Sequence, residues 1–166
     1  MQNSLHDILA YILLRSEQIL KRKGLSKYRI TKIVYLCDWC YACACGRQIT
    51  DIRWFFDNYG PFVWDVYNTL TKDSSLFELS VILTPYENEI TTFALKNMAY
   101  EPNITRDVQD CLEYVLEHVV NLKNQEFTNL VYATYPIRTS RRYTSLNLVE
   151  KANEYRKIRK HESSND

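Results

Sequence analysis

The stretch that decides the fold reads Gly46-Arg47-Gln48-Ile49-Thr50-Asp51-Ile52-Arg53-Trp54-Phe55-Phe56-Asp57-Asn58-Tyr59-Gly60-Pro61. Gly46 is expected to end a long apolar helix, because a residue without Cβ readily adopts the left-handed conformation that follows helix ends. Tyr59-Gly60-Pro61 is expected to open the next helix, since a proline in the first turn loses no hydrogen bond. Between them, Trp54-Phe55-Phe56 carries more aromatic area than a solvated loop leaves exposed. We therefore expect this connector to pack on the core and to supply a candidate working surface.

The helix before the connector is expected to begin after Ser26 and to run to Gly46. Apolar residues cover most of its circumference, and Asp38 is the only charged residue between Ile33 and Cys45. A helix that is apolar nearly all round is a central one, packed on several sides. A carboxylate on such a helix needs either a hydrogen-bond donor or a position in contact with solvent. We expect Asp38 to pair with a Tyr, Arg or Lys, with a partner-facing or catalytic role as the alternative.

Hydrophobic periodicity outlines the rest of the chain. Five more helices are expected: from Asn3 or Ser4 to Gly24, from Pro61 to Lys72, after Thr105, from Asn124 to Tyr132, and from Thr144 to Lys160. The runs Leu79–Thr84 and Glu89–Leu95 favour strands and predict a hairpin. The expected fold class is α+β: a mostly helical single domain over residues 1–160, with about six helices and a small β-hairpin or antiparallel sheet. Residues 161–166 are expected to form a frayed polar tail.

Length and composition narrow the class of protein. A chain of 166 residues with 46% hydrophobic and 25% charged residues is typical of one globular domain. The net charge of +1 argues against a nucleic-acid binder that depends on phosphate neutralisation. The first residues lack a basic segment typical of secretion signals, and the apolar run Ile8–Leu14 is too short to span a bilayer. We expect a cytoplasmic protein without a membrane partner, whose five cysteines are thiols.

The cysteine pattern Cys37-x-x-Cys40-x-x-Cys43-x-Cys45 resembles metal-ligand spacing, but it lies inside a helical pattern in which the later cysteines diverge. We expect small apolar core residues here, with a zinc or iron–sulfur site as the alternative. The three histidines stand in no nucleophile motif, and no phosphate-binding or zinc-protease motif is present in the sequence. We therefore expect no catalytic residue, no metal ligand and no cofactor, and a protein that is not an enzyme.

Two further features are candidates for contact with a partner. The segment from Arg138 to Lys160 carries eight basic residues against two acidic ones. Such a run is usually a solvated face, but contact with an acidic partner or nucleic acid stays open. The helix expected from Pro61 has an inner apolar stripe formed by Phe62, Val63, Val66, Tyr67 and Leu70. Trp64 lies opposite this stripe, so it is either covered by another element or offered to a partner.

Several residues together resemble the signature of a known family. Lys32-Ile33-Val34-Tyr35-Leu36 is followed by Gly46-Arg47, Trp54, Tyr59-Gly60-Pro61 and Val66-Tyr67. This order is similar to that of the Panacea domain, found in SocA-like antitoxins that are also called GepA-like phage-associated proteins. The match is dense from Lys32 to Leu70. Near the C-terminus the chain has Ala133-Thr134-Tyr135-Pro136-Ile137, where the family often carries a Thr-His pair and a Pro-Trp.

The resemblance implies a mostly helical α+β fold and an antitoxin of a toxin–antitoxin pair. The implied partner is a cognate protein toxin, of a kind that often blocks translation, neutralised by direct protein–protein contact. The alternative is a nucleic-acid-binding regulator that uses the basic C-terminal helix, although we expect nucleic-acid binding to be weak at most. The candidate partner-binding residues lie in the connector and the helix after it: Arg53, Trp54, Phe55, Asp57, Tyr59, Gly60, Pro61, Trp64 and Asp65.

Overall fold

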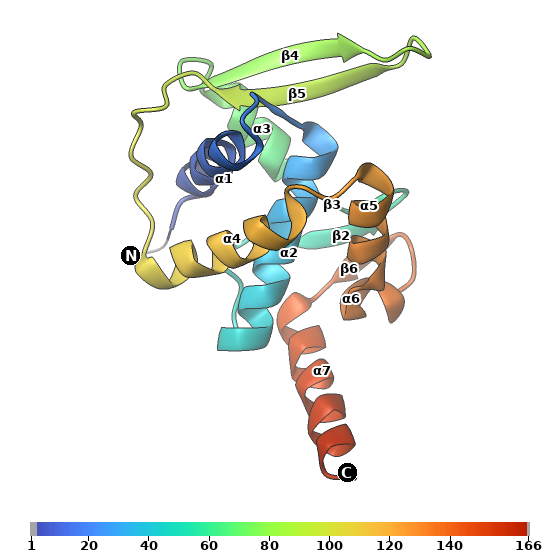
Figure 1. Cartoon of the computed structure of the whole chain (residues 1–166). Coiled ribbons are helices and arrows are strands. Elements are labelled where there is room, and N and C mark those ends of the chain that lie inside the picture. The colour runs from blue at the N-terminus through green and yellow to red at the C-terminus, as the bar shows by residue number, and fades with distance from the viewer. Residues whose placement is uncertain (1–2, 166) are drawn as a thin grey trace.

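The computed structural model describes residues 3–165, which form seven helices and two three-stranded antiparallel sheets (Figure 1). The helices are α1 (Leu5–Leu20), α2 (Lys27–Cys45), α3 (Asp65–Lys72), α4 (Arg106–Val119), α5 (Asn124–Ala133), α6 (Tyr135–Arg138) and α7 (Leu148–Ser163). The strands are β1 (Leu25–Ser26), β2 (Trp54–Asp57), β3 (Gly60–Phe62), β4 (Phe77–Leu83), β5 (Glu89–Leu95) and β6 (Thr144–Leu146). The expected α+β, mostly helical fold is confirmed.

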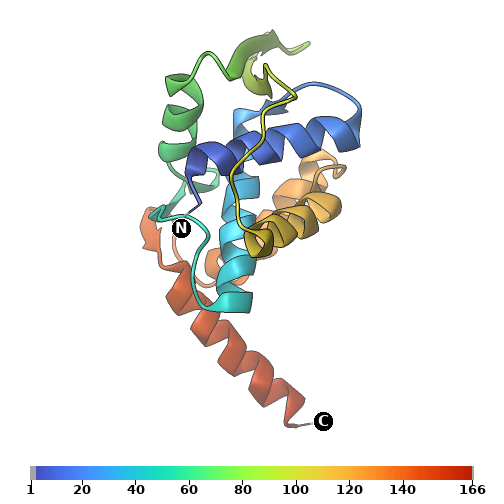
Figure 2. The ribbon, with the colours of Figure 1, turned by 90° about the vertical axis from the view of Figure 1, so that its left-hand side faces the viewer.

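Helix α2 is the centre of the fold. Helices α1, α3, α4 and α7 pack against it, and Figures 1 and 2 show it running through the middle of the molecule. Every residue from Arg29 to Trp39 is buried, which confirms the predicted central helix. The Ser26 hydroxyl accepts a hydrogen bond from the Arg29 amide at 3.1 Å, and Gly46 ends the helix with φ +74°, both as predicted.

Each sheet joins segments that are distant in the chain. One has the strand order β1-β5-β4 and the other β3-β2-β6. The predicted hairpin is confirmed as β4–β5, and the short strand β1 adds a third strand to it through the pair Leu25–Phe93. In the other sheet, β6 pairs with β2, so that Leu146 lies opposite Trp54. The connector is therefore held between helix α2 and the C-terminal part of the chain.

The helix predicted to begin at Pro61 is wrong in its start, because α3 begins at Asp65. Tyr59-Gly60-Pro61 lies instead in a β-hairpin formed by β2 and β3. Residues 54–57 alternate between buried and exposed or half-buried positions, which is the period of a strand. The local pattern missed this because β2 owes part of its pairing to β6, about ninety positions further along the chain.

The ends of helices α1 and α7 also differ from the prediction, and β4 spans Phe77–Leu83 rather than Leu79–Thr84. Helix α1 ends at Leu20 rather than near Gly24, because Lys21 itself adopts the left-handed conformation with φ +57°. The last helix begins at Leu148, since Asn147 caps it and the preceding residues form β6. It continues to Ser163, so three residues of the expected polar tail are helical. The short helix α6, which contains Pro136, was not predicted.

No helix in the described part of the chain is long and apolar enough to cross a membrane.

Candidate interaction surface

A buried carboxylate fixes the connector to the central helix. Asp38 is fully buried on α2 and accepts hydrogen bonds from the Thr50 amide at 2.9 Å and from the Thr50 hydroxyl. It also accepts one from the Trp54 indole Nε1 at 2.8 Å. Burial raises the pKa of Asp38 to about 6, while the hydrogen bonds from Thr50 and Trp54 oppose this rise. The predicted Tyr, Arg or Lys partner is therefore wrong, because the partners are Thr50, Trp54 and, at 3.4 Å, Gln48.

The hairpin that follows has one buried and one exposed face. Trp54 and Phe56 point inward, and the Trp54 ring meets the Tyr35 ring at a centroid distance of 5.6 Å. Phe55 points outward and pairs across the strands with Phe62. Because residues directly opposite on two strands share a face, these two phenylalanines lie side by side on the outer face.

Gly60 lets this hairpin close over a buried lysine. Its φ of +97° is a conformation that side chains with Cβ rarely adopt. A Cβ at this position would lie 3.5 Å from the Tyr132 ring and 3.8 Å from Lys32 Cε. Lys32 is only 2% exposed, and its ammonium lies 4.6 Å from the centroid of the Tyr28 ring. Burial lowers the pKa of Lys32 to about 8.

A row of four aromatic side chains, Phe55, Phe62, Trp64 and Tyr67, continues from the hairpin to helix α3; we call it the aromatic row. The ring centroids of Phe62 and Trp64 are 5.2 Å apart, and those of Trp64 and Tyr67 are 5.8 Å apart, both edge to face. The Lys27 ammonium lies 4.7 Å from the centroids of both Trp64 and Tyr67. Trp64 is nevertheless 58% exposed. The row therefore offers solvent a large aromatic anchor that its neighbours hold in place.

The nine predicted partner-binding residues differ in how far the structure exposes them. Three are buried and serve the fold: Trp54, Gly60 and Pro61. Asp57 is half-buried, and the other five are exposed: Arg53, Phe55, Tyr59, Trp64 and Asp65. The sequence reasoning missed Phe62, Tyr67 and Lys27 as members of this surface, because the first two were assigned to the inner stripe of a helix. The alternating burial of β2 is not visible in the sequence, because Trp54, Phe55 and Phe56 are all aromatic, so no local signal marked the outward face of this hairpin.

The cysteines lie on helix α2 and, for Cys111, on α4, and all five are free thiols. Burial raises the pKa of Cys37 well above its ordinary value. In the described residues, no group of three His, Cys, Asp or Glu side chains is placed to hold a metal ion. Two histidines bond within the protein: His6 pairs with Asp73 at 2.9 Å, and His118 Nδ1 lies 2.7 Å from the Tyr114 carbonyl oxygen.

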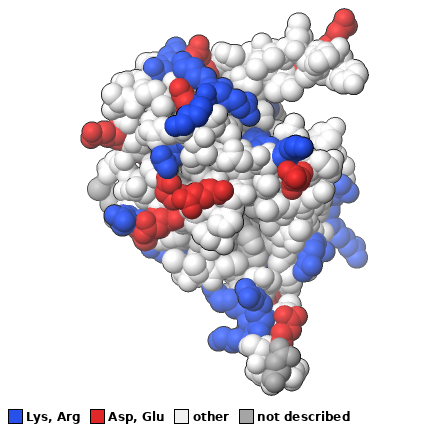
Figure 3. Space-filling model, in the orientation of Figure 1, with Lys and Arg blue, Asp and Glu red and all other residues white. Residues whose placement is uncertain are grey.

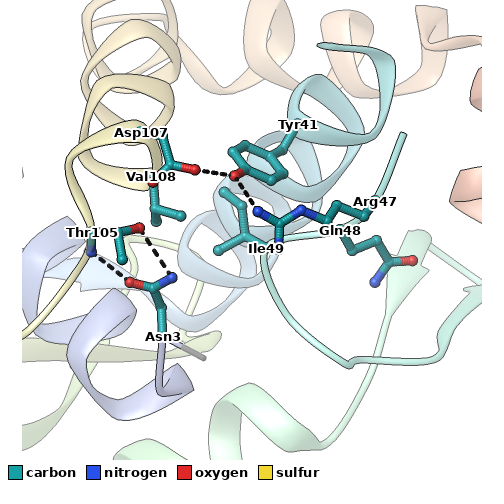
Figure 4. A pocket seen from close by; sticks show the side chains of 8 residues that line it. All are labelled: Asn3, Tyr41, Arg47, Gln48, Ile49, Thr105, Asp107 and Val108. Carbon is teal, nitrogen blue, oxygen red and sulfur yellow. Dashed lines mark hydrogen bonds between the residues drawn. The ribbon is translucent and has the colours of Figure 1, made fainter. Parts of the chain in front are cut away.

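A polar pocket of about 470 Å³ lies between α2, α4 and the start of the connector (Figure 4). Tyr41 donates a hydrogen bond to Asp107 and accepts one from Arg47 at 3.3 Å. Asn3 and Thr105 bond each other on the opposite wall. Burial and the Asp107 carboxylate raise the pKa of Tyr41 to about 12, so its hydroxyl stays protonated at neutral pH. These polar side chains hydrogen-bond to one another, and we therefore assign the pocket a structural role in joining α2 to α4.

The basic C-terminal segment is divided between internal and exposed positions. Arg156 donates hydrogen bonds to the carbonyl oxygens of Ala42 and Cys43 at 3.0 and 2.9 Å, so it caps the end of α2. Lys157 and Lys160 are exposed on the outer half of α7. Figure 3 shows Lys and Arg side chains gathered over the lower part of the molecule, where α7 projects from the body.

Comparison with known proteins gives one match. The family model described as "Antitoxin SocA-like, Panacea domain" matches residues 30–136. The matched segment contains most of α2, the connector, the aromatic row and both strands of the β4–β5 hairpin. No curated protein and no solved structure matches the chain.

Proposed function

Because the chain belongs to the family of SocA-like antitoxins with a Panacea domain, we propose that it neutralises a growth-inhibiting protein toxin by binding it directly. In this proposal the antitoxin acts in the cytoplasm, performs no chemistry and needs no cofactor. The toxin is one that blocks translation. The proposal requires a surface on this protein that can bind another protein tightly.

The exposure of Trp64 within the aromatic row is the observation that supports this proposal most strongly. Large aromatic side chains, with arginine, dominate the energetics of protein interfaces, because they bury much area at a small cost in side-chain entropy. Trp64 is held by edge-to-face contacts with Phe62 and Tyr67 and by Lys27, so little further ordering is needed when a partner covers it. A preorganised anchor of this kind suits a high-affinity interface.

Charged side chains near the aromatic row supply orientation and selectivity. Arg53 precedes Phe55 in the chain and Asp65 follows Trp64, and both are exposed. Charges at the rim of an interface mainly affect association rate and partner choice, whereas the buried anchor sets the lifetime of the complex. We therefore assign the binding energy mainly to Trp64 and the selectivity mainly to Arg53 and Asp65.

Growth rescue tests the proposal. Cells that express the neighbouring toxin gene are co-transformed with the wild type, with Trp64→Ala, or with Tyr114→Ala as the matched control. Tyr114 is also 58% exposed but lies on α4. The proposal predicts that Trp64→Ala loses rescue while Tyr114→Ala keeps it, with both variants folded by circular dichroism. Full rescue by a folded Trp64→Ala would contradict the assignment.

The alternative, a nucleic-acid-binding regulator, has one observation in its favour. Helix α7 projects from the body and carries exposed basic residues on its outer half. If this helix binds DNA, log Kd changes linearly with log salt, by about one unit for each phosphate contact. We expect weak binding without sequence preference; tight, sequence-selective binding at physiological salt would favour the regulator instead.

A further inference from the structure

The β4–β5 hairpin forms an arm that projects beyond the helices (Figure 1). Apolar side chains cover it although they are open to solvent: Leu79 is 45% exposed, Val81 55% and Leu83 68%. No charged residue occurs from Leu79 through Tyr86, and Figure 3 shows the arm as a nearly uncharged projection. Contiguous exposed apolar surface of this kind commonly marks an interaction site.

The outer strand of the arm has a free edge. Strand β4 pairs with β5 on one side and is the last strand of its sheet. Backbone hydrogen bonds join Lys96 to Leu76 and Thr84 to Asn88, and the register is continuous between these pairs. Hydrogen-bonded pairs alternate along an antiparallel ladder, so the even-numbered residues of β4 bond to β5. The amides and carbonyls of Leu79, Val81 and the other odd-numbered residues therefore point away from the sheet.

This edge lacks the features that usually protect an edge strand. Natural sheets block their edges with lysine, proline, bulges or short strands. Strand β4 has seven residues, contains no lysine and no proline, and pairs with β5 without a bulge. In Figure 1 the free edge faces away from the helices, so the body of the protein does not cover it.

The sequence of β4 is complementary to itself when read antiparallel. If Ser80 lies on a twofold axis, Leu79 stands opposite Val81 of the second copy, and Phe77 stands opposite Leu83. The odd-numbered residues Leu79, Val81 and Leu83 have free backbone groups that can form the new ladder, whereas the Phe77 amide already donates to the Asp73 carbonyl at 3.0 Å. The only charge on the strand, Glu78, would face Ile82 and already lies 3.6 Å from Lys23, so no like charges oppose each other.

We propose that β4 pairs antiparallel with β4 of a second copy across a twofold axis at Ser80, which joins the two three-stranded sheets into one of six strands. Self-complementarity about one residue is what a symmetric contact requires, because each patch must match itself. Pro85, which has no amide hydrogen, stops the ladder just beyond Leu83 and so favours this register over one moved toward the tip. The inference does not depend on toxin binding, because the aromatic row lies between β2 and α3, on other elements than β4.

Oligomeric state tests the proposal. Size-exclusion chromatography with light scattering should give a dimer for the wild type at tens of micromolar. Val81→Lys places a charge in the new ladder and should raise the dimer dissociation constant at least about tenfold. Thr91→Lys is the matched control: Thr91 lies opposite Val81 on the same face but on β5, away from the edge. This control should remain a dimer, and circular dichroism of both variants should match that of the wild type.

Cross-linking tests the register. In a Cys45→Ser background, Ser80→Cys should form a disulfide-linked dimer on oxidation, because residues opposite in a non-hydrogen-bonded pair have Cα atoms about 4.5 Å apart. Ile82→Cys, which would face Glu78 rather than itself, should not. A monomeric wild type, a dimeric Val81→Lys, or equal cross-linking at both positions would overturn the proposal. If the wild type is monomeric and Val81→Lys loses toxin binding, the edge belongs to the toxin instead.

Discussion

Replacing the buried lysine should make the protein more stable at neutral pH. Lys32 is 2% exposed, and its ammonium has aromatic rings as neighbours: Tyr28 at 4.6 Å and Phe62 at 5.8 Å from the ring centroids. Methionine has a similar length and flexibility but carries no charge. We therefore expect Lys32→Met to keep the packing beneath Gly60 and to remove the cost of burying a cation.

The size of the effect follows from the pKa. Burial lowers the pKa of Lys32 from 10.5 to about 8, which corresponds to about 3 kcal/mol against the charged form in the folded state. Cation–π contacts with the Tyr28 and Phe62 rings offset about 1–2 kcal/mol of this desolvation cost. The free energy of unfolding of Lys32→Met should therefore exceed that of the wild type by about 1–2 kcal/mol at pH 7.

The pH dependence gives the decisive readout. Below pH 8 both the folded and the unfolded wild type keep the proton, so the cost is constant. Between about pH 8 and pH 10.5 the folded state has lost the Lys32 proton while the unfolded state still binds it. The free energy of unfolding of the wild type therefore rises with pH relative to that of the variant. Urea denaturation of both proteins at pH 7 and pH 10 measures this difference. The reasoning is refuted if Lys32→Met is less stable than the wild type at pH 7, or if its advantage is unchanged at pH 10.

Three further predictions concern the connector and the cysteines. Asp38→Asn places amide hydrogens against the donors of Thr50 and Trp54, and should lower the free energy of unfolding in urea by about 3 kcal/mol; a loss below about 1 kcal/mol would show that these bonds matter little. Gly60→Val forces a side chain into φ +97° beside Tyr132 and should cost about 1 kcal/mol or more, so an unchanged thermal melt would contradict the strained conformation. Protein purified without chelator should hold no metal on its cysteines, and stoichiometric zinc or iron in elemental analysis would be evidence against this.

The sequence predicted the helical framework because its signals are local. Ser26 and Gly46 bound the central helix through capping and a left-handed conformation, and each acts within a few residues of its own position. The β4–β5 hairpin was likewise visible in two β-favouring runs. The family signature gave the antitoxin class, which composition and spacing alone did not reach.

The candidate site was predicted only in part because long-range pairing shapes it. Strand β2 pairs with β6, and nothing near Trp54 indicates that Leu146 lies opposite. The resulting strand turns Phe55 and Phe62 outward, whereas a helix beginning at Pro61 would have turned Phe62 inward. Trp64 is exposed in the structure, but it precedes α3 and lies beside Phe62 and Tyr67 rather than opposite them, as the predicted helix would have placed it. The burial of Lys32 beneath Gly60 likewise depends on how the hairpin folds back onto α2.

The affinity for purified toxin, measured by isothermal titration calorimetry, tests the proposed antitoxin interface most directly. Loss of an interface anchor costs about 2 kcal/mol or more, so Trp64→Ala should raise Kd about thirtyfold. Tyr114→Ala, with the same exposed fraction on α4, should stay within about twofold of the wild type. If Trp64→Ala binds the toxin as tightly as Tyr114→Ala does, the aromatic row is not the toxin-binding surface.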